Sequence, residues 1–331
     1  MFSSFDHAYM ARALQLAERG LYTAKPNPMV GCVIARKDKI VGEGFHLRTG
    51  EPHAEVHALR EAGEDARGAT AYVTLEPCAH MGRTPPCADA LVAAGITRVV
   101  AACRDPFASV DGDGFRKLMA AGVTTETGLM EGAARELNRG FFSRIERGRP
   151  WLRVKLAMSL DGRTGLASGE SKWITSRAAR ADVQHWRARC GAILTGSGTV
   201  LADDPQLTVR LDEAVQVTAP VRVVLDTRGR VSHATRVFDD SAQTIAVHAV
   251  DIVPDYGDDI VAFAVPRDGD GLDLRAMLSQ LAQRDINEVQ VEAGATLCGS
   301  MMRQGLVTNC CCTLRRCCWA RRAVRCSPDW A

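Results

Sequence analysis

The sequence predicts an α/β fold divided into two domains. Its 331 residues are about twice the length of an ordinary domain, and helix-like and strand-like segments alternate along it. A charged stretch that ends beside Pro150 interrupts this alternation near the middle. Because alternating strands and helices are typical of a sheet covered on both faces, we expect an α/β sheet in each half.

In the first half, apolar periodicity and terminating residues define the expected elements. Asp6 is a plausible N-cap and Gly20 a plausible stop for a first helix, and a hairpin that turns at residues 37–39 follows it. The further expected elements are a helix at 53–63, a strand at 69–75, a helix at 88–95, a strand at 97–103 and a helix at 114–123.

The second half begins a new series after the charged stretch at 136–151, so we expect domains at 1–149 and 150–307. The expected strands are 151–159, 191–196, 221–226, 244–249 and 288–294, and the expected helices are 177–189, 272–284 and 295–305.

The composition of the chain indicates which classes of binding partner to expect. No apolar run of about eighteen residues and no leader of a basic region followed by an apolar stretch is present, so we expect a cytoplasmic protein without a membrane partner. Residues 308–331 hold five Arg and one Asp, which leaves the body of the chain slightly acidic although the whole has a charge of +2. Because of this charge pattern, we expect no nucleic-acid partner. The sequence leaves open whether the chain forms a homo-oligomer.

Residues 53–87 contain the ligand types of a zinc site. His53, Cys78 and Cys87 supply one nitrogen and two sulfurs, which leaves one position of a tetrahedral site for water. Zinc lowers the pKa of such a water to near 7. Glu55 follows His53 by two residues and is the expected proton carrier. His57 is an alternative ligand, although packing beside the site is favoured for it.

The order His53-Ala54-Glu55, Pro77-Cys78, Cys87 is typical of zinc deaminases, but eight residues rather than two separate the cysteines. The segment PCAHMGRTPPC resembles the bifunctional deaminase–reductase family of riboflavin biosynthesis. The resemblance covers about residues 5–307. It implies a cytidine-deaminase-like three-layer domain followed by a dihydrofolate-reductase-like domain.

In the first domain, the resemblance implies zinc ligands His53, Cys78 and Cys87 and a catalytic Glu55. Phe107 departs from the family, which usually has Asn there, and a Phe side chain cannot make the hydrogen bond of an Asn. The implied substrate-binding residues are Asn27, His46, His80, Arg83 and Asp105.

In the second domain, Gly294 follows the strand residues EVQVE (288–292) and opens a helix whose free N–H groups suit a phosphate. The resemblance implies NADPH as the cofactor. The implied NADPH residues are Ala157, Trp173, Thr199, Asp203, Thr227, Gly294, Ala295, Thr296, Leu297, Cys298, Gly299 and Ser300. The implied substrate residues are Ser171, Arg187, Leu207, Arg210 and Glu292.

The implied activity is zinc-dependent removal of the 2-amino group from a phosphoribosylamino-pyrimidine, followed by NADPH-dependent reduction of its ribosyl group. The residues alone leave open two other classes of function. A nucleic-acid deaminase would favour a Cys-x-x-Cys spacing and a basic face, and a non-catalytic metal-binding protein would release no ammonia.

Residues 308–331 are unlike the rest, because they hold six of the twelve cysteines. Reading the codons one base earlier would turn many of these cysteines into leucines, so we predict a frameshift after Val307. On this interpretation the final reductase strands are lost, the tail is disordered and the reductase domain is incomplete and weakly active. A chain that is only a deaminase is the alternative.

Overall fold

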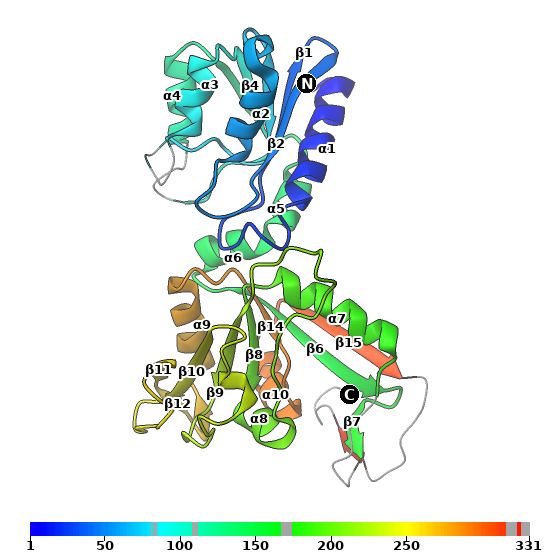
Figure 1. The fold of residues 1–331 in the computed structure, drawn as a ribbon, viewed down its shortest axis with the longest axis vertical. Helices are drawn as coiled ribbons and strands as arrows, with labels where there is room; N and C mark the ends of the chain where they lie inside the picture. The colour runs from blue at the N-terminus through cyan, green and yellow to red at the C-terminus, as the bar shows by residue number, and fades with distance from the viewer. Residues whose placement is uncertain (80, 82–84, 108–111, 167–173, 316–322, 326–331) are drawn as a thin grey trace. The chain divides into compact units, whose positions relative to one another are not determined.

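The structure is a computed structural model that describes residues 1–331 except 80, 82–84, 108–111, 167–173, 316–322 and 326–331 (Figure 1). The chain forms two compact units, Met1–Arg147 and Gly148–Ala331. The domain boundary expected between residues 149 and 150 falls two residues after this division. No helix in the described ranges is both long enough and apolar enough to cross a lipid bilayer.

The first unit is built on a five-stranded sheet with the strand order β2-β1-β3-β4-β5. β1 and β2 form an antiparallel hairpin, and β3, β4 and β5 run parallel to one another. Its strands are β1 Gly31–Arg36, β2 Lys39–Phe45, β3 Thr70–Val73, β4 Arg98–Ala101 and β5 Thr124–Thr127. Its α-helices are α1 Ser4–Glu18, α2 Ala54–Ala62, α3 Cys87–Ala93, α4 Asp113–Ala120, α5 Glu131–Leu137 and α6 Arg139–Arg147, and a 3₁₀ turn spans Gly63–Ala66.

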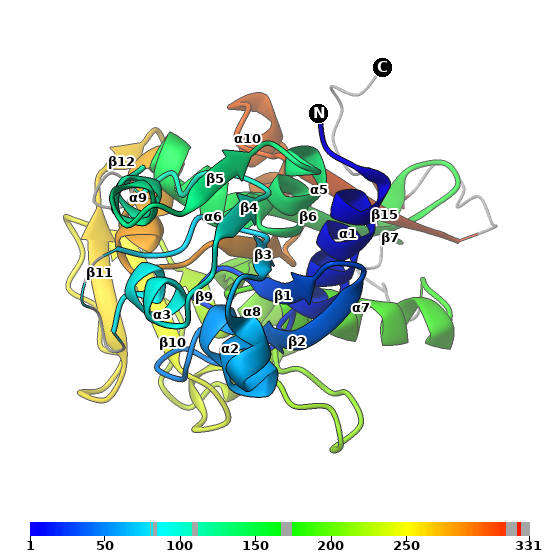
Figure 2. The same cartoon turned by 90° about the horizontal axis from the view of Figure 1, so that it is seen from above.

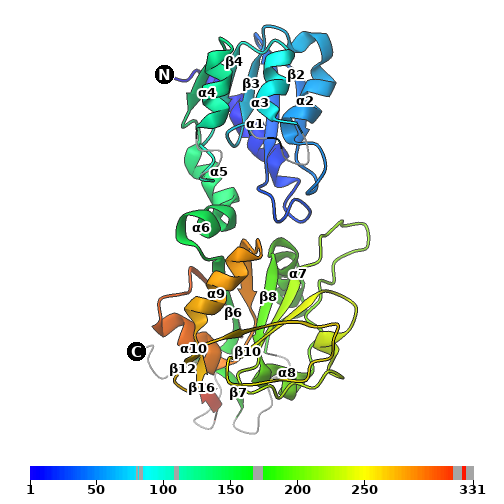
Figure 3. The same cartoon turned by 90° about the vertical axis from the view of Figure 1, so that its left-hand side faces the viewer.

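Alternating side chains of the strands divide this unit into three layers. Cys32 and Ile34 of β1 pack in the cluster formed with α2, α3 and α4. Val33 and Ala35 pack in the cluster formed with α1, α5 and α6. Figure 2 shows the sheet between the two helical layers, and Figure 3 looks onto the side with α2, α3 and α4. The expected sheet with both faces covered is therefore confirmed.

Close packing fixes α2 against the hairpin. A Cβ on Gly44 of β2 would lie 2.2 Å from the carbonyl oxygen of Ala54, so only glycine permits this approach. Ala54 is the first residue of α2, and the contact holds the start of that helix against the sheet. This start of α2 carries two of the residues expected to act in the deaminase, His53 and Glu55.

The first helix begins earlier than the sequence predicted, and Asp6 is not its N-cap. Ser3 is the cap, and its side chain accepts a hydrogen bond from the backbone N–H of Asp6. The Asp6 carboxylate accepts in return from the backbone N–H of Ser3, which completes a capping box. The prediction was wrong because Ser3 and Asp6 are both good caps and the reciprocal pair satisfies two N–H groups.

The second unit contains a seven-stranded sheet with the order β11-β10-β9-β8-β14-β6-β15, in which all neighbours run parallel. The strands of this sheet are β6 Trp151–Ser159, β8 Ala192–Gly196, β9 Val221–Leu225, β10 Thr244–Ala249, β11 Val261–Val265, β14 Glu288–Val291 and β15 Asn309–Arg315. Two small ribbons pair β7 Arg163–Leu166 with β16 Ala323–Arg325 and β12 Arg267–Asp268 with β13 Gly271–Leu272.

Helices cover both faces of this sheet as well. The α-helices are α7 Arg177–Arg189, α8 Ser197–Asp203, α9 Leu274–Gln283 and α10 Ala295–Arg303, and a 3₁₀ turn spans Arg236–Phe238. Met277 of α9 and Met301 of α10 are fully buried against one face. Val200 of α8 packs in the cluster on the opposite face together with Ile193 of β8.

The expected loss of structure after residue 307 is wrong for residues 309–315. These residues form β15, which pairs in parallel with residues 153–159 of β6 (Figure 1). The preceding segment anchors the strand, because Leu306 is fully buried and the N–H of Thr308 donates to the carbonyl of Leu152. Backbone pairing of this kind does not require leucine side chains, so the cysteines are compatible with a strand.

Candidate active sites

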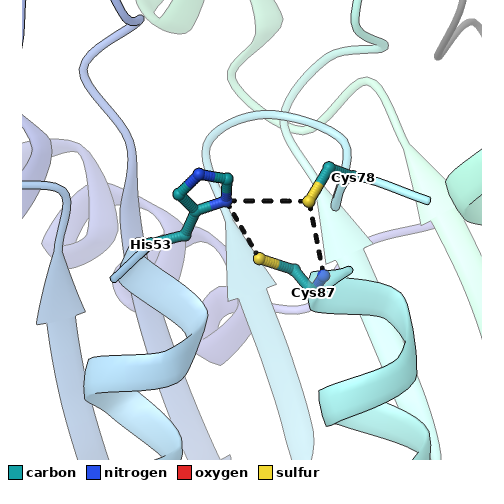
Figure 4. A group of neighbouring side chains, drawn as sticks. All are labelled: His53, Cys78 and Cys87. Carbon is teal, nitrogen blue, oxygen red and sulfur yellow. Dashed lines mark hydrogen bonds between the residues drawn. The ribbon is translucent and has the colours of Figure 1, made fainter. Parts of the chain in front are cut away.

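Three side chains of the first unit converge into a compact nitrogen and sulfur cluster. Nδ1 of His53 lies 3.2 Å from Sγ of Cys87 and 3.6 Å from Sγ of Cys78. All three candidate ligand atoms lie within 4.8 Å of one another. Figure 4 shows the imidazole and both thiols pointing toward one another. The sequence prediction placed the same three residues together.

His53 and Cys87 stand at the starts of two helices, and Cys78 lies on the segment between β3 and α3. His53 is the N-cap of α2 and has extended backbone angles, so its ring projects beyond the helix. Cys87 is the first residue of α3, and its N–H donates to Sγ of Cys78 at 3.3 Å. The N–H of Ala88 donates to the backbone carbonyl of Cys78. These bonds tie the Cys78 segment to the start of α3.

The electrostatics of the cluster favour a thiolate at Cys78. Hydrogen bonds with Cys87 and His53 hold the pKa of Cys78 well below its ordinary value, although burial acts in the opposite direction. The hydrogen bond with Cys78 raises the pKa of His53 above its ordinary value. A thiolate is the form that binds a metal ion, so this environment suits metal coordination.

Glu55 lies in the first turn of α2 beside this cluster, and only 3% of it is exposed. Its Oε2 atom is buried and has no hydrogen-bond partner among the described residues. Burial raises the pKa of Glu55 above its ordinary value. A buried, unpartnered carboxylate oxygen next to a His/Cys/Cys set is suited to exchange a proton with a ligand of the metal.

His57, the alternative ligand, is not a member of the cluster among the described residues. Its Nε2 atom is buried and has no hydrogen-bond partner there. His57 packs against β2, because a Cβ on Gly44 would lie 2.7 Å from the Cβ of His57.

Asn27 and His46 adjoin the cluster. The rings of His46 and His53 pack edge to face with centroids 5.3 Å apart. Nδ1 of His46 lies 3.3 Å from the carbonyl oxygen of Pro52. Because a carbonyl only accepts, this contact assigns the proton to Nδ1, and Nε2 then accepts from Nδ2 of Asn27 at 3.1 Å. Burial lowers the pKa of His46, which favours this neutral form.

Of the other expected deaminase residues, the structure describes Asp105, which lies on the loop after β4. Asp105 is half-buried, and its Oδ1 accepts from the N–H of Phe107 at 2.9 Å. The Phe107 residue is 43% exposed. His80 and Arg83 lie outside the described residues, so their expected substrate contacts stay predictions.

The second unit contains a cavity of about 820 Å³ at the start of α10. Its size falls within the range of cofactor sites. Eight of the expected NADPH residues line it: Thr199, Asp203, Thr227, Gly294, Ala295, Thr296, Leu297 and Ser300. They come from α8, the segment after β9 and the first turns of α10, so the fold gathers residues that are up to about 100 positions apart.

The remaining NADPH residues differ in position. Cys298 lies on α10 but is only 1% exposed, and its thiol donates to the carbonyl of Ala293. Gly299 is likewise buried, and neither residue is among those that line the cavity. Ala157 lies on β6, paired with Thr313, also away from this lining. Trp173 is outside the described residues.

Two expected substrate residues of the reductase form a buried ion pair. Nε and Nη2 of Arg187 donate to the two carboxylate oxygens of Glu292 at 2.7 and 2.8 Å. Nη1 of Arg187 donates to the carbonyl of Thr208. Burial alone would raise the pKa of Glu292, but the bonds from Arg187 outweigh it and lower that pKa. The pair joins α7 to the end of β14.

Leu207 and Arg210, two further expected substrate residues of the reductase, are not part of this ion pair. Leu207 is buried with a positive φ of 53°, and Arg210 is exposed. The N–H of Arg210 donates to Oε1 of Gln184 on α7. Ser171 lies outside the described residues.

Known proteins resemble the chain over nearly all its length. The family model of the RibD C-terminal domain matches residues 150–315, and that of the cytidine and deoxycytidylate deaminase zinc-binding region matches residues 3–103. The riboflavin biosynthesis protein RibD of Escherichia coli is 51% identical over 312 residues, which are 91% of this chain and 85% of that protein. The RibD of Haemophilus influenzae is 46% identical over 92% of this chain and 84% of its own length.

The chain belongs to the RibD family.

Solved RibD structures have the same architecture. Form 2 of Acinetobacter baumannii RibD has a TM-score of 0.92 at 44% identity and covers 99% of this chain and 91% of its own. A Thermotoga maritima protein described as a diaminohydroxyphosphoribosylaminopyrimidine deaminase/5-amino-6-(5-phosphoribosylamino)uracil reductase has a TM-score of 0.81 at 37% identity. It covers 91% of this chain and 84% of its own. The RibD match confirms the expected pairing of a cytidine-deaminase-like domain with a reductase domain.

Membership in the RibD family makes the chain an enzyme of riboflavin biosynthesis with a deaminase and a reductase activity. Zn²⁺ and NADPH are its cofactors. The residues fit both groups. The His/Cys/Cys donor set suits zinc, and the cavity at the start of α10 offers backbone N–H groups to a dinucleotide phosphate.

Sequence reasoning missed several residues at these RibD sites. Glu76 accepts four backbone N–H groups beside the metal cluster, although its neighbours in sequence gave no sign of this. Asp268 and Asp270 line the reductase cavity from the β12–β13 ribbon. The sequence RDGDGL around them indicates only a turn, so no signal distinguished them from an ordinary surface loop.

Proposed function

We propose that the chain catalyses two consecutive reactions on one phosphoribosylated pyrimidine. In the first, 2,5-diamino-6-(5-phosphoribosylamino)pyrimidin-4(3H)-one loses its 2-amino group as ammonia. In the second, the resulting 5-amino-6-(5-phosphoribosylamino)uracil is reduced to the ribitylamino compound. The observation that carries the proposal is the buried, unpartnered Oε2 of Glu55 beside the His53, Cys78 and Cys87 cluster.

In the deaminase, His53, Cys78 and Cys87 would hold the zinc ion, and Glu55 would move the proton. Zinc, when bound, supplies a water molecule that is acidic enough to ionise near neutral pH. Glu55 accepts a proton from the water that adds to carbon 2 and passes it to the amino nitrogen. The carbon–nitrogen bond then breaks, and ammonia leaves.

Asn27 and His46 would orient the pyrimidine. The bond from Asn27 Nδ2 to His46 fixes the amide, so its Oδ1 is presented as an acceptor for a ring N–H. Asp105 suits a ribose hydroxyl, and we assign His80 and Arg83 to the phosphate by the family resemblance. The loop bond between Asp105 and Phe107 supports a fixed position for Asp105.

In the reductase, Gly294 and the first N–H groups of α10 would receive the pyrophosphate of NADPH. Thr199, Asp203 and Thr227 would contact the rest of the cofactor from the other wall of the cavity. Ala157, Trp173, Cys298 and Gly299 are assigned to this site by resemblance alone.

The Arg187–Glu292 pair gives these two residues a supporting role in the substrate site. Because Nε, Nη1 and Nη2 of Arg187 already donate within the protein, we assign the phosphate to the exposed Arg210 instead. Ser171 and Leu207 complete the proposed substrate set. In the reaction itself, carbon 1′ gains the hydride of NADPH and the ring oxygen gains a proton.

We also propose a cytoplasmic location and a small-molecule substrate rather than nucleic acid. The body of the chain is slightly acidic, which disfavours a polyanion. The described cysteines, including Cys78 and Cys87, form no disulfide, as is usual where thiols are kept reduced.

Glu55→Gln tests the deaminase assignment. The variant should keep about one zinc per chain and release ammonia at least ~100-fold more slowly, because general acid–base catalysis supplies a factor of this size. Cys87→Ser should lose zinc as well as activity. Normal ammonia release by Glu55→Gln would refute the proposed role, and the NADPH reaction of the same variant, started from the deaminated compound, serves as the control for folding.

A further inference from the structure

Glu76 occupies an unusual position next to the metal cluster. It is only 4% exposed and precedes Cys78 by two residues. Its Oε1 accepts from the N–H groups of Gly114 and Phe115 at 3.1 and 3.4 Å. Its Oε2 accepts from the N–H groups of Gly112 and Asp105 at 3.2 and 3.4 Å. A carboxylate is the side chain best able to accept four such donors.

We propose that Glu76 is a positioning residue that sets the proposed substrate-binding Asp105 loop at a fixed distance from the zinc-binding Cys78 loop. The inference rests on the proposed deaminase function and adds a residue to it. Glu76 is not a metal ligand among the described residues, so it would act only through the segments that it joins.

On the metal side, Glu76 lies three residues beyond the end of β3. Its own N–H donates to the carbonyl of Cys103 at 3.0 Å. Cys103 follows β4, the parallel neighbour of β3, so this bond joins the ends of two adjacent strands. Pro77 limits backbone rotation between Glu76 and Cys78. The position of the Glu76 backbone therefore restricts where the Cys78 thiol can lie.

On the substrate side, the Glu76 carboxylate replaces a local helix cap. Gly112 is the N-cap of α4 and has no side chain to bond the first N–H groups of that helix. Glu76 supplies the acceptor from about 38 residues away and places a negative group at the positive end of α4. The same carboxylate also bonds the N–H of Asp105.

Close packing supports the same connection. A Cβ on Gly114 would lie 2.0 Å from the carbonyl oxygen of Pro77 and 3.2 Å from Oε1 of Glu76. The start of α4 therefore lies directly on the backbone between Glu76 and Cys78. Displacing α4 would disturb the metal loop and the Asp105 loop together.

Two substitutions test the proposal in the zinc-loaded full-length chain. Glu76→Gln keeps the size of the side chain but turns an N–H₂ group toward two of the N–H donors. Gly114→Ala leaves the carboxylate intact and pushes α4 away from Pro77. In both variants we expect the KM for the diamino substrate to rise about tenfold or more. We expect kcat/KM per bound zinc to fall on the order of 100-fold, as for a misplacement of about 1 Å.

The chain supplies its own controls. Reduction of the deaminated compound by NADPH should be unchanged, because it takes place in the other unit. Glu131→Gln removes an exposed acid from the first turn of α5 and should leave both activities unaltered. A purely structural Glu76 would instead lower zinc content and kcat together while the KM of the remaining active enzyme stayed normal.

Each outcome decides the proposal. A raised KM with zinc retained in either variant supports it. An unchanged KM of the zinc-loaded enzyme in both variants overturns it. Loss of zinc and of deaminase activity together in both variants also overturns it, since Glu76 would then only stabilise the fold. If the unmodified chain released no ammonia, the proposed function would fail before this inference was tested.

Discussion

Phe107 stands near the proposed substrate at a position where the family resemblance implies Asn. Its backbone N–H donates to Asp105, but its ring is partly exposed and cannot donate or accept a strong hydrogen bond. Phe107→Asn should lower the KM of the deaminase by a factor equivalent to at most ~1.5 kcal/mol, the value of one recovered hydrogen bond. Steady-state ammonia release measures this KM, and an unchanged or higher value would mean that Phe107 is there for packing.

At the residue scale, the metal cluster could be predicted from the sequence, whereas its supporting contacts could not. His53, Cys78 and Cys87 have side chains of special chemistry in a recognisable order. Glu76 is a common residue whose partners lie about 30 to 40 positions away, and only the fold brings them together. The same holds for Arg187 and Glu292, which are 105 positions apart.

At the scale of elements, helices and strands with clear periodicity were predicted well. The strand at 151–159 and the helix at 177–189 have the expected bounds. α6 was missed, because its residues 139–147 were interpreted only as part of the charged stretch at the domain boundary. Phe141 and Phe142 of this helix are in fact buried against the first sheet. β5 was missed because its sequence, TTET, contains no apolar residue.

The strand β15 makes a direct prediction about thiol chemistry. Cys310 and Cys312 are exposed with their sulfurs 3.5 Å apart, while Cys311 between them is half-buried. Because side chains alternate along a strand, Cys310 and Cys312 lie on one face and Cys311 lies on the other. A trivalent arsenical should therefore bridge Cys310 and Cys312 in the zinc-loaded chain. Cys311→Ser should keep this adduct, and Cys310→Ser or Cys312→Ser should lose it.

Mass spectrometry of the tail peptide reads the result. If all three serine variants weakened the adduct equally, residues 309–315 would not form the alternating strand. The earlier expectation of a disordered tail would then hold for this segment too.

The start of α1 predicts a dependence of stability on pH. Oδ1 of the buried Asp6 accepts from Arg98 and from the hydroxyl of Tyr72, and Oδ2 accepts from Ser3. Burial alone would raise the pKa of Asp6, but these hydrogen bonds outweigh it and hold the pKa well below its usual range. A carboxyl with a depressed folded pKa stabilises the fold above its unfolded pKa of about 3.9, and this contribution is lost as the pH falls further.

Asp6→Asn should consequently destabilise the first unit by about 2 kcal/mol at pH 7, the scale of charged hydrogen bonds. The difference from the unmodified chain should shrink as the pH falls below ~4. Hydrogen exchange of α1 amides in the full chain at several pH values measures it. A difference that stayed constant down to pH 2 would show that Asp6 is not an ionised acceptor in the folded state.

At the scale of the whole molecule, each unit contains the proposed residues of one activity, and the two proposed substrates carry the same ribosyl phosphate. The two-domain α/β organisation could be predicted because composition and periodicity change near Pro150. The parallel pairing of β15 with β6 could not be predicted, because the cysteine-rich sequence gave no sign of a strand. With β15 in the sheet, we expect the chain to reduce its substrate rather than act only as a deaminase.

The frameshift after Val307 stays a prediction about the origin of the tail sequence. Sequencing the gene across this position from independent template DNA measures it. A reading frame confirmed without a nearby insertion or deletion would contradict the frameshift, and the structural account of residues 309–315 would be unaffected.

The central claim is that one chain removes an amino group and then reduces the product. The most direct test follows ammonia and NADPH together after the purified chain is mixed with 2,5-diamino-6-(5-phosphoribosylamino)pyrimidin-4(3H)-one. We predict ammonia release without NADPH, and NADPH oxidation that lags behind ammonia and does not exceed it. Removing zinc should stop both signals, and adding the deaminated compound should restore only NADPH oxidation. NADPH oxidation that preceded ammonia release, or that continued from the diamino substrate without zinc, would contradict the account.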